Sequence, residues 1–131
     1  MSSRPEAIGI VVAHGNMAQG LVDAVRRIAG SAADGLVAVS NEARTPQELV
    51  ADLEAAAGGG PALVFVDLQT GSCGMAALVS CRESVERRVI CGVNLPMLLH
   101  FVFNRSEPFD DLLPSLVEKG REAIKPAPSG G

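Results

Sequence analysis

Residues 8 to 16 read Ile-Gly-Ile-Val-Val-Ala-His-Gly-Asn and contain the change of pattern that decides the fold. The near-continuous apolar run from Ala7 to Ala13 is typical of a parallel strand that is covered on both faces. Gly15 and Asn16 then turn the chain, and Asn16 is expected to cap an amphipathic helix that ends at Gly30. The stretch therefore predicts a strand, a tight turn and a helix, with a histidine at the turn.

That histidine, His14, lies directly after the predicted strand, at the start of the turn that leads into the predicted helix. In an open α/β sheet, ligands bind at the edge formed by the carboxyl ends of the strands. The following helix directs its free N–H groups and positive dipole end to the same place, which suits an anion such as phosphate. We therefore hypothesise that His14 accepts a phosphoryl group. A lone histidine at a strand end is more often a locally hydrogen-bonded polar residue, so the hypothesis depends on its neighbours.

The rest of the chain repeats this alternation of strand and helix. Thr45, Pro46 and Glu48 form a capping-box pattern at the start of one helix, and Pro114 either kinks the last helix or marks its true start. Residues 126–131 are expected to be a frayed, flexible tail. Beyond the first strand and helix, the patterns predict strands at 35–40, 62–66 and 88–93 and helices at 45–57, 72–83, 94–103 and 108–124.

This order of elements predicts an α/β fold with an open parallel sheet and helices on both faces. We expect a flavodoxin-like strand order of about 2-1-3-4, whose switch point lies between the first and third strands. A length of 131 residues suits one hydrophobic core. A single domain over residues 1–131 is therefore expected, with its core at about residues 7–125.

The predicted strand order places Asp67, which follows the third strand, beside His14. A carboxylate facing one imidazole nitrogen fixes the tautomer and leaves the other nitrogen as a nucleophile. Gly71 allows close backbone approach, and Ser72 offers a hydroxyl beside the free N–H groups of the next helix. Singly, each residue is explained by a turn or a helix cap, but together they favour phosphoryl transfer. With histidine as the acceptor, neither a metal nor a cofactor is expected to be required.

Composition argues against several classes of protein. The chain holds four Phe and no Trp or Tyr, and its formal net charge is −4 with eleven Lys and Arg. Nucleic-acid binding, which uses stacked aromatic rings and clustered basic residues, is therefore not expected. The N-terminus lacks a signal-peptide pattern, and the apolar stretch at 89–103 is interrupted and too short to span a bilayer. We expect a cytoplasmic protein without an integral membrane segment.

The remaining distinctive side chains are interpreted mainly as parts of the core. The cysteines lack a CxxC spacing and are expected to be buried free thiols in a reducing cytosol. His100 lies in an apolar helical stretch and is expected to be half-buried and hydrogen-bonded. Met75 is expected to border the site as well. The expected core residues include Cys73, Cys81 and Cys91; Met17, Met75 and Met97; and Leu21, Val25 and Ile28 in the first helix.

Three segments together resemble the mannose-type enzyme IIA domain of the bacterial phosphoenolpyruvate-dependent sugar phosphotransferase system. The similarity covers about residues 7–125 in the same order, and its most specific piece is the segment that ends at Leu98. The three segments are His14-Gly15 after an apolar strand, Val66-Asp67-Leu68-Gln69-Thr70-Gly71-Ser72, and Gly92-Val93-Asn94-Leu95-Pro96-Met97-Leu98.

The resemblance implies that His14 accepts a phosphoryl group from the phosphocarrier HPr and passes it to an enzyme IIB partner, for sugar uptake or for regulation. Asp67 would be the carboxylate that is hydrogen-bonded to this histidine. The phosphoryl oxygens would be held by Gly15, Thr70, Gly71 and Ser72. The family is commonly homodimeric, so a homodimer is expected.

The chain departs from the family pattern at Thr70, Cys73 and Met75, where the family usually has glycine, proline and asparagine. A phosphoryl donor subunit for dihydroxyacetone kinase and a non-catalytic, flavodoxin-like signalling or binding module stay open as alternatives. A response-regulator receiver is disfavoured because no carboxylate adjoins His14 at the end of the first strand. A mononucleotide site is disfavoured because no glycine-rich phosphate-binding pattern opens the first helix.

Overall fold

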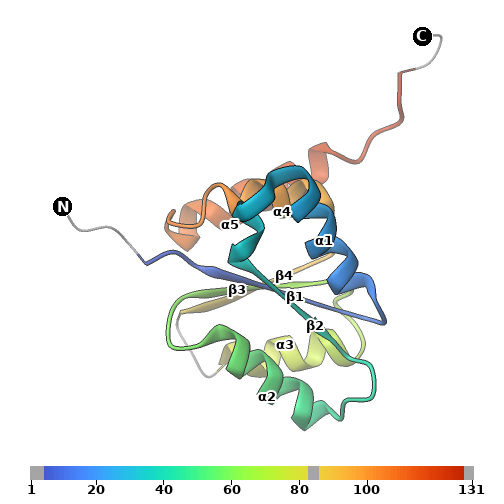
Figure 1. Ribbon diagram of the computed structural model, residues 1–131, viewed down its shortest axis with the longest axis vertical. Coiled ribbons are helices and arrows are strands. Elements are labelled where there is room, and N and C mark those ends of the chain that lie inside the picture. The colour runs from blue at the N-terminus through green and yellow to red at the C-terminus, as the bar shows by residue number, and fades with distance from the viewer. Residues whose placement is uncertain (1–4, 83–85, 129–131) are drawn as a thin grey trace.

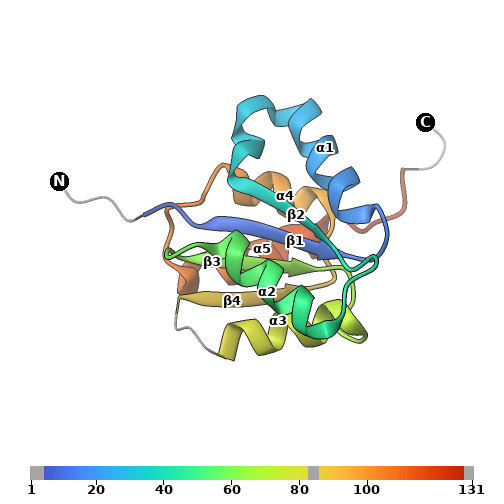
Figure 2. The ribbon, with the colours of Figure 1, turned by 60° about the horizontal axis from the view of Figure 1, so that its bottom comes forward.

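The computed structural model describes residues 5–82 and 86–128, and four parallel strands form the sheet at its centre (Figure 1). The spatial order of the strands is β2-β1-β3-β4, as Figure 2 shows. The predicted fold class and strand order are therefore confirmed. The strands are β1 Ile8–Ala13, β2 Leu36–Ser40, β3 Ala62–Val66 and β4 Arg87–Cys91.

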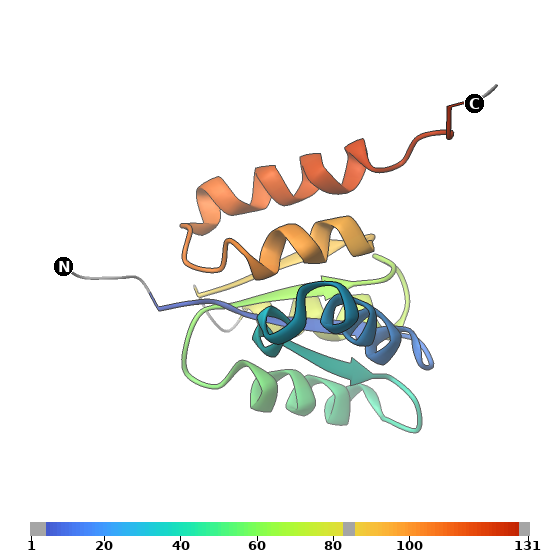
Figure 3. The ribbon, with the colours of Figure 1, turned by 45° about the horizontal axis from the view of Figure 1, so that its top comes forward.

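Helices cover the sheet on both faces (Figure 1). One face carries α1 Met17–Ala29, α4 Leu95–Val102 and α5 Phe109–Glu122, which lie side by side in Figure 3. The other face carries α2 Pro46–Ala57 and α3 Ser72–Arg82. A short 3-10 segment, Gly30–Gly35, joins α1 to β2. Right-handed crossovers between parallel strands produce this two-sided arrangement.

The two faces of the sheet bury separate apolar clusters. Side chains alternate between the faces of a strand, so Val11 packs under α1 and α4 while Ile10 and Val12 pack under α2 and α3. Phe65 and Phe101 meet edge to face on the α4 side, with 5.1 Å between ring centroids. Gly9 makes this contact possible, because a Cβ there would lie 2.5 Å from Phe101 Cε2.

Local sequence explains where several helices begin and end. Thr45 Oγ1 accepts a hydrogen bond from the Glu48 backbone N–H, and Glu48 Oε1 accepts one from the Thr45 N–H, which completes the predicted capping box. Asn94 Oδ1 caps α4 by accepting from the Met97 N–H, while its Nδ2 donates to the Gly120 carbonyl. Asn94 thereby ties α4 to α5.

Some predicted element ends are wrong by one or two residues. The second strand begins at Leu36, and the fourth runs from Arg87 to Cys91. The fourth strand ends early because Gly92 adopts a φ of 85° and its N–H, like that of Val93, bonds to the Val66 carbonyl. The third helix ends at Arg82, and the predicted last residue, 83, lies outside the described residues.

One local alternative is decided and one local prediction fails. Pro114 lies inside α5, which begins at Phe109, so of its two expected positions it occupies the one within the helix and does not mark the start. Asn16 occupies the N-cap position of α1, but its side chain makes no capping hydrogen bond. Residues 124–128 have no regular secondary structure, and the last three residues of the predicted tail, 129–131, lie outside the described residues.

Several side chains predicted to be buried are exposed. The side chain of Met97 is buried as expected, but Met17, Met75 and Ile28 are 44, 60 and 63% exposed. Helix α1 buries a face of smaller residues that includes Ala18 and Val22 as well as Val25, so Met17 and Ile28 point outward. All three cysteines are free: Cys73 is buried, Cys81 is half-buried and Cys91 is exposed at the end of the edge strand β4.

No helix in the described ranges 5–82 and 86–128 has both the length and the apolar character needed to cross a membrane.

A buried arginine clamps three elements on the α2 side. The Arg87 side chain, 8% exposed at the start of β4, donates through Nη1 to Glu54 of α2 and to Ser80 Oγ of α3. Ser80 Oγ also donates to Glu54 Oε1 at 3.0 Å. The hydrogen bond from Arg87 is the largest influence on the Glu54 carboxyl and, against the opposing effect of burial, holds its pKa below the usual value.

Glu54 is expected to contribute to the acid sensitivity of the fold. A carboxyl whose pKa is lower in the folded chain stabilises it above the unfolded pKa, near 4.5, and this stability is lost as the pH falls through the folded pKa. Glu54→Gln should therefore lower the free energy of unfolding at pH 7 and reduce its decrease between pH 5 and pH 3. Urea unfolding at several pH values measures both effects. Glu118→Gln, on α5 across the sheet, is the control, and parallel curves for wild type and Glu54→Gln would contradict the expectation.

Candidate active site

His14 and Asp67 meet at the carboxyl edge of the sheet because their strands are neighbours in register. Val12 of β1 pairs with Val66 of β3, so the residues just beyond these strand ends lie side by side. The Asp67 carboxylate lies 2.7 Å from His14 Nδ1 through its Oδ2 atom. The juxtaposition expected from the strand order is therefore present.

The Asp67 carboxylate is held by three N–H groups. Its Oδ2 accepts from the backbone N–H of His14 at 3.0 Å as well as from the ring, and its Oδ1 accepts from the Leu68 N–H at 2.9 Å. Burial, the largest single influence, raises the pKa of Asp67, but the hydrogen bonds and charge of His14 and the Leu68 N–H together hold it below the usual value. An ionised carboxylate can only accept, so Nδ1 carries a proton, and in the neutral ring Nε2 then presents a lone pair.

His14 Nε2 faces the loop that leads into α3. A Cβ built on Gly71 would lie 3.5 Å from Nε2, and Gly71 has a φ of 96°, a conformation that favours glycine. Helix α3 begins at the next residue, Ser72, and its first N–H groups have no partners within the helix. The positive end of a helix therefore lies close to the free imidazole nitrogen, where a phosphoryl group would be stabilised.

Two residues at the end of β2, Ser40 and Asn41, also belong to this site and were not identified from the sequence. Asn41 Oδ1 accepts from the Gly15 N–H at 3.3 Å, and its Nδ2 donates to Ser72 Oγ at 3.2 Å. Ser40 Oγ donates to the Gly15 carbonyl at 2.9 Å. The sequence signal was available, since these polar residues end a predicted strand just as Asp67 does.

The remaining residues predicted from the sequence differ in how directly they contact the site around His14. Gly15 forms the turn after His14 with a φ of 58° and is held by the end of β2. Ser72 is linked through Asn41 to that turn. Thr70 is exposed in the loop, and within the described part of the chain it makes no hydrogen bond to the other site residues. His100 is half-buried, as expected, and its Nε2 lies 3.3 Å from Ser115 Oγ.

Gly74, in the first turn of α3, fixes the loop beneath His14 and was also missed. A Cβ there would lie 2.1 Å from the Gln69 carbonyl oxygen and 3.0 Å from that of Leu68. The backbone of residues 67–71 folds against the helix at this point, so only glycine leaves enough room. Sequence spacing alone does not reveal such a contact, because it depends on how the backbone of the loop after β3 folds against the first turn of α3.

Gly74→Ala is expected to displace the loop and destabilise the fold by about 2–3 kcal/mol, the usual cost of forcing an extra methyl group into packed structure. Phosphoryl acceptance should fall with it, because residues 67–71 position Asp67 and Gly71. Urea unfolding and single-turnover phosphorylation measure the two effects. The matched control is Gly20→Ala in α1, where a Cβ meets nothing within 4 Å and a small stabilisation is expected. Equal stability of the two variants would contradict the packing argument.

The site lies on an open surface, and its histidine side chain is 45% exposed. Three exposed apolar side chains lie on the segments around it: Met17 opens α1, Leu68 is in the loop, and Met75 is in the first turn of α3. Met75 thus borders the site, as the sequence indicated, although it does not fill the core. Exposed apolar groups at one place mark surfaces that contact a partner.

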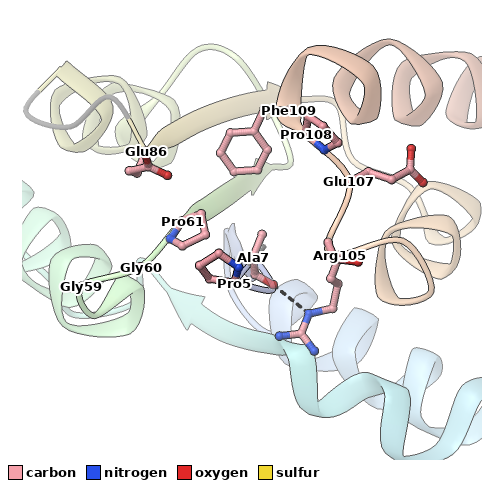
Figure 4. Close-up of a pocket in the computed structure, with 11 residues that line it drawn as sticks. Pro5, Ala7, Gly59, Gly60, Pro61, Glu86, Arg105, Glu107, Pro108 and Phe109 are labelled. Carbon is pink, nitrogen blue, oxygen red and sulfur yellow. Dashed lines mark hydrogen bonds between the residues drawn. The ribbon is translucent and has the colours of Figure 1, made fainter. Parts of the chain in front are cut away.

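A cavity of about 460 Å³ lies at the opposite edge of the sheet (Figure 4). Ala7 and Pro61, which precede β1 and β3, line it together with Arg105 and Phe109. Arg105 Nε donates to the Ala7 carbonyl at 2.7 Å, so this side chain helps to hold the segment that leads into β1. Because the cavity adjoins the amino ends of the strands, it is separate from the histidine at their carboxyl ends.

Comparison with known proteins identifies similar chains. The family model EIIA-man, described as the PTS system fructose IIA component, matches residues 9–115. The phosphotransferase system component EIIA from Streptococcus agalactiae is 25% identical, with 92% of this chain and 96% of that chain covered and a TM-score of 0.85. The mannose/sorbose-specific IIA subunit from Enterococcus faecalis is 27% identical, with 97% and 98% covered and a TM-score of 0.82. The comparison with curated proteins finds no match.

Proposed function

Since this chain belongs to the EIIA-man family of phosphotransferase-system IIA components, we propose that it accepts a phosphoryl group from phospho-HPr on His14 and passes it to an enzyme IIB partner. Family membership by itself supports a phosphotransfer role in a sugar phosphotransferase system. The observation that carries the finer proposal is the pairing of His14 Nδ1 with the ionised Asp67, which leaves Nε2 free beside Gly71.

The transfer needs one bond to form and one to break. His14 Nε2 supplies its lone pair to the phosphorus atom, and the bond between phosphorus and the donor nitrogen of phospho-HPr breaks with its electron pair left on the donor. The proton on His14 Nδ1 stays in its hydrogen bond to Asp67, and the carboxylate balances the positive charge that develops on the ring. Phosphoryl transfer relies mainly on such positioning and electrostatics.

The groups around Nε2 suit the phosphoryl oxygens. The first N–H groups of α3 and the Ser72 hydroxyl supply donors, and Gly71 leaves space for the oxygens to approach the backbone. Asn41 fixes Ser72 relative to the turn at Gly15, so it acts as a positioning residue. Thr70, in the same loop, completes the proposed phosphoryl-binding set.

The surface around the site suits a protein donor and a protein acceptor. Because the His14 side chain is 45% exposed, another protein can reach it from solvent. The exposed side chains of Met17, Leu68 and Met75 provide apolar contact area around the histidine. HPr and enzyme IIB would use this surface in turn, since both must reach the same nitrogen.

The proposal includes a homodimer that acts in the cytoplasm. Strand β4 is an edge of the described sheet, and α3 beside it exposes Leu78 and Val79, which gives a second copy an apolar surface to cover. The three free thiols suit a reducing compartment. Light scattering coupled to gel filtration tests the dimer, and a monomer mass at micromolar concentration would contradict it.

Intact-mass spectrometry tests the carrier role. The protein is incubated with phosphoenolpyruvate, enzyme I and HPr, and then with an enzyme IIB partner. We expect one phosphoryl group that is lost in acid and stable in base, as phosphohistidine is, and that moves to enzyme IIB when this partner is added. If HPr becomes phosphorylated while this chain acquires no group, the donor assignment is wrong.

A further inference from the structure

Three different metal-binding groups converge at the base of the candidate site. One ligand atom each from His14, Asp67 and Cys73 lies within 4.8 Å of the others. An imidazole nitrogen, a carboxylate oxygen and a thiol sulfur are the three donor types that Zn²⁺ uses in proteins, and three protein ligands leave a fourth position open. From the sequence, Cys73 was expected to be only a small core residue.

Burial distinguishes this group from ordinary exposed acidic clusters. The Asp67 side chain is 8% exposed, and Cys73 is fully buried. His14, at 45% exposed, forms the side that faces solvent, so an ion could enter past the imidazole. Two ligands are thus fixed by packing, while the third closes the site from outside.

The electrostatic environment of Cys73 favours a cation beside it. Burial first, and then the negative charge of Asp67, raise the pKa of the Cys73 thiol. A metal cation placed between the sulfur and the carboxylate would remove this repulsion.

We propose that Zn²⁺ or a similar thiophilic divalent cation binds through Cys73 Sγ, an Asp67 carboxylate oxygen and an imidazole nitrogen of His14, and that this binding blocks phosphoryl acceptance. The inhibitory effect rests on the proposed function, whereas the metal site does not. On binding, the thiol proton passes to solvent and the sulfur bonds to the metal as a thiolate. Solvent occupies the fourth position on the exposed side.

Metal binding prevents phosphoryl acceptance whichever imidazole nitrogen of His14 binds the cation. A cation on Nε2 occupies the lone pair that attacks phosphorus. When a cation binds Nδ1, the proton there moves to Nε2, which then has no lone pair to attack phosphorus. The cation also draws the Asp67 carboxylate to itself, so the hydrogen bond that orients the ring is lost. The metal is therefore an inhibitor at this site and has no part in the transfer.

Cobalt substitution tests the site without any phosphorylation. Co²⁺ bound by a thiolate absorbs in the near ultraviolet, and Zn²⁺ displaces it, so one titration reports both ligation by sulfur and competition. We expect a 1:1 signal from the wild-type protein and from Cys91→Ser, which removes an exposed thiol elsewhere. Cys73→Ser and Cys73→Ala should lose the signal, with Zn²⁺ affinity weakened by more than the roughly 10- to 100-fold that loss of an outer partner causes.

The phosphorylation assay tests the inhibitory effect. Zn²⁺ should prevent phosphoryl acceptance by the wild-type protein, and EDTA should restore it, while Cys73→Ala should be phosphorylated at the same Zn²⁺ concentration. Equal inhibition of both proteins overturns the proposed block, because the ion then acts on the donor proteins. Absence of a Cys73-dependent cobalt signal overturns the site itself. A cobalt signal in a chain that is never phosphorylated supports the metal site and refutes the proposed function.

Discussion

Replacing His14 with glutamine is expected to abolish phosphoryl acceptance. Glutamine retains a polar side chain of similar reach but has no nitrogen with a nucleophilic lone pair, since its amide nitrogen is conjugated with the carbonyl. The fold should be little affected, because the side chain is 45% exposed and follows β1 without belonging to the core. A single-turnover reaction with phospho-HPr, followed by intact-mass spectrometry, should give no modified protein.

The second histidine provides the matched control. His100 is half-buried in α4, with its Nε2 near Ser115 Oγ and away from the carboxyl edge of the sheet. His100→Gln should accept one phosphoryl group at about the wild-type rate, with some loss of stability from the altered contact. The assignment of His14 as the acceptor is wrong if the His14→Gln protein acquires an acid-labile phosphoryl group. It is also wrong if a folded His100→Gln protein acquires none.

Asp67→Asn should slow phosphoryl acceptance by about 10²- to 10⁴-fold, the range seen when a group that orients or stabilises a transition state is replaced. The asparagine amide can donate to His14 Nδ1, which favours the tautomer whose proton sits on Nε2. That tautomer has no lone pair on the nitrogen that faces Gly71. The carboxamide also carries no charge to balance the developing imidazolium.

Rapid-quench measurement of phosphorylation over a range of phospho-HPr concentrations separates rate from binding. We expect the maximal rate to fall while the concentration for half-maximal rate changes little, since Asp67 is covered and makes no partner surface. Asp34→Asn, which removes an exposed carboxylate paired with Arg26, controls for loss of charge and should react normally. A wild-type rate for a folded Asp67→Asn protein would show that tautomer control is unimportant here.

The fold could be predicted because its signals are local and repeated. The apolar run before His14 and the capping box at Thr45 each specify one element, and the alternation of elements then restricts the topology. The neighbourhood of His14 and Asp67 follows from that topology, because parallel strands bring their carboxyl ends to one edge. The chemical roles of these residues stay predictions until the variants are measured.

The features that sequence reasoning missed depend on exact three-dimensional placement. Asn41 forms hydrogen bonds to both Gly15 and Ser72 because the residue that follows β2 lies between the turn after β1 and the start of α3. Glycine is required at position 74 because the backbone carbonyls of Leu68 and Gln69 pack against it. The path of that loop has no repeating sequence pattern from which it could be predicted. The exposure of Met17 followed from the rotation of α1, where smaller residues already fill the contact with the sheet.

The separation of the two apolar clusters has a consequence for synthesis on the ribosome, where a chain emerges from its amino end. The fully buried members of the cluster under α2 and α3 all lie between Ile10 and Ala77. The opposite cluster also needs Phe101, Leu112 and Leu116 from α4 and α5. The cluster under α2 and α3 can therefore pack while α4 and α5 are still inside the exit tunnel. The apolar face of α1 stays partly exposed until α4 and α5 have emerged.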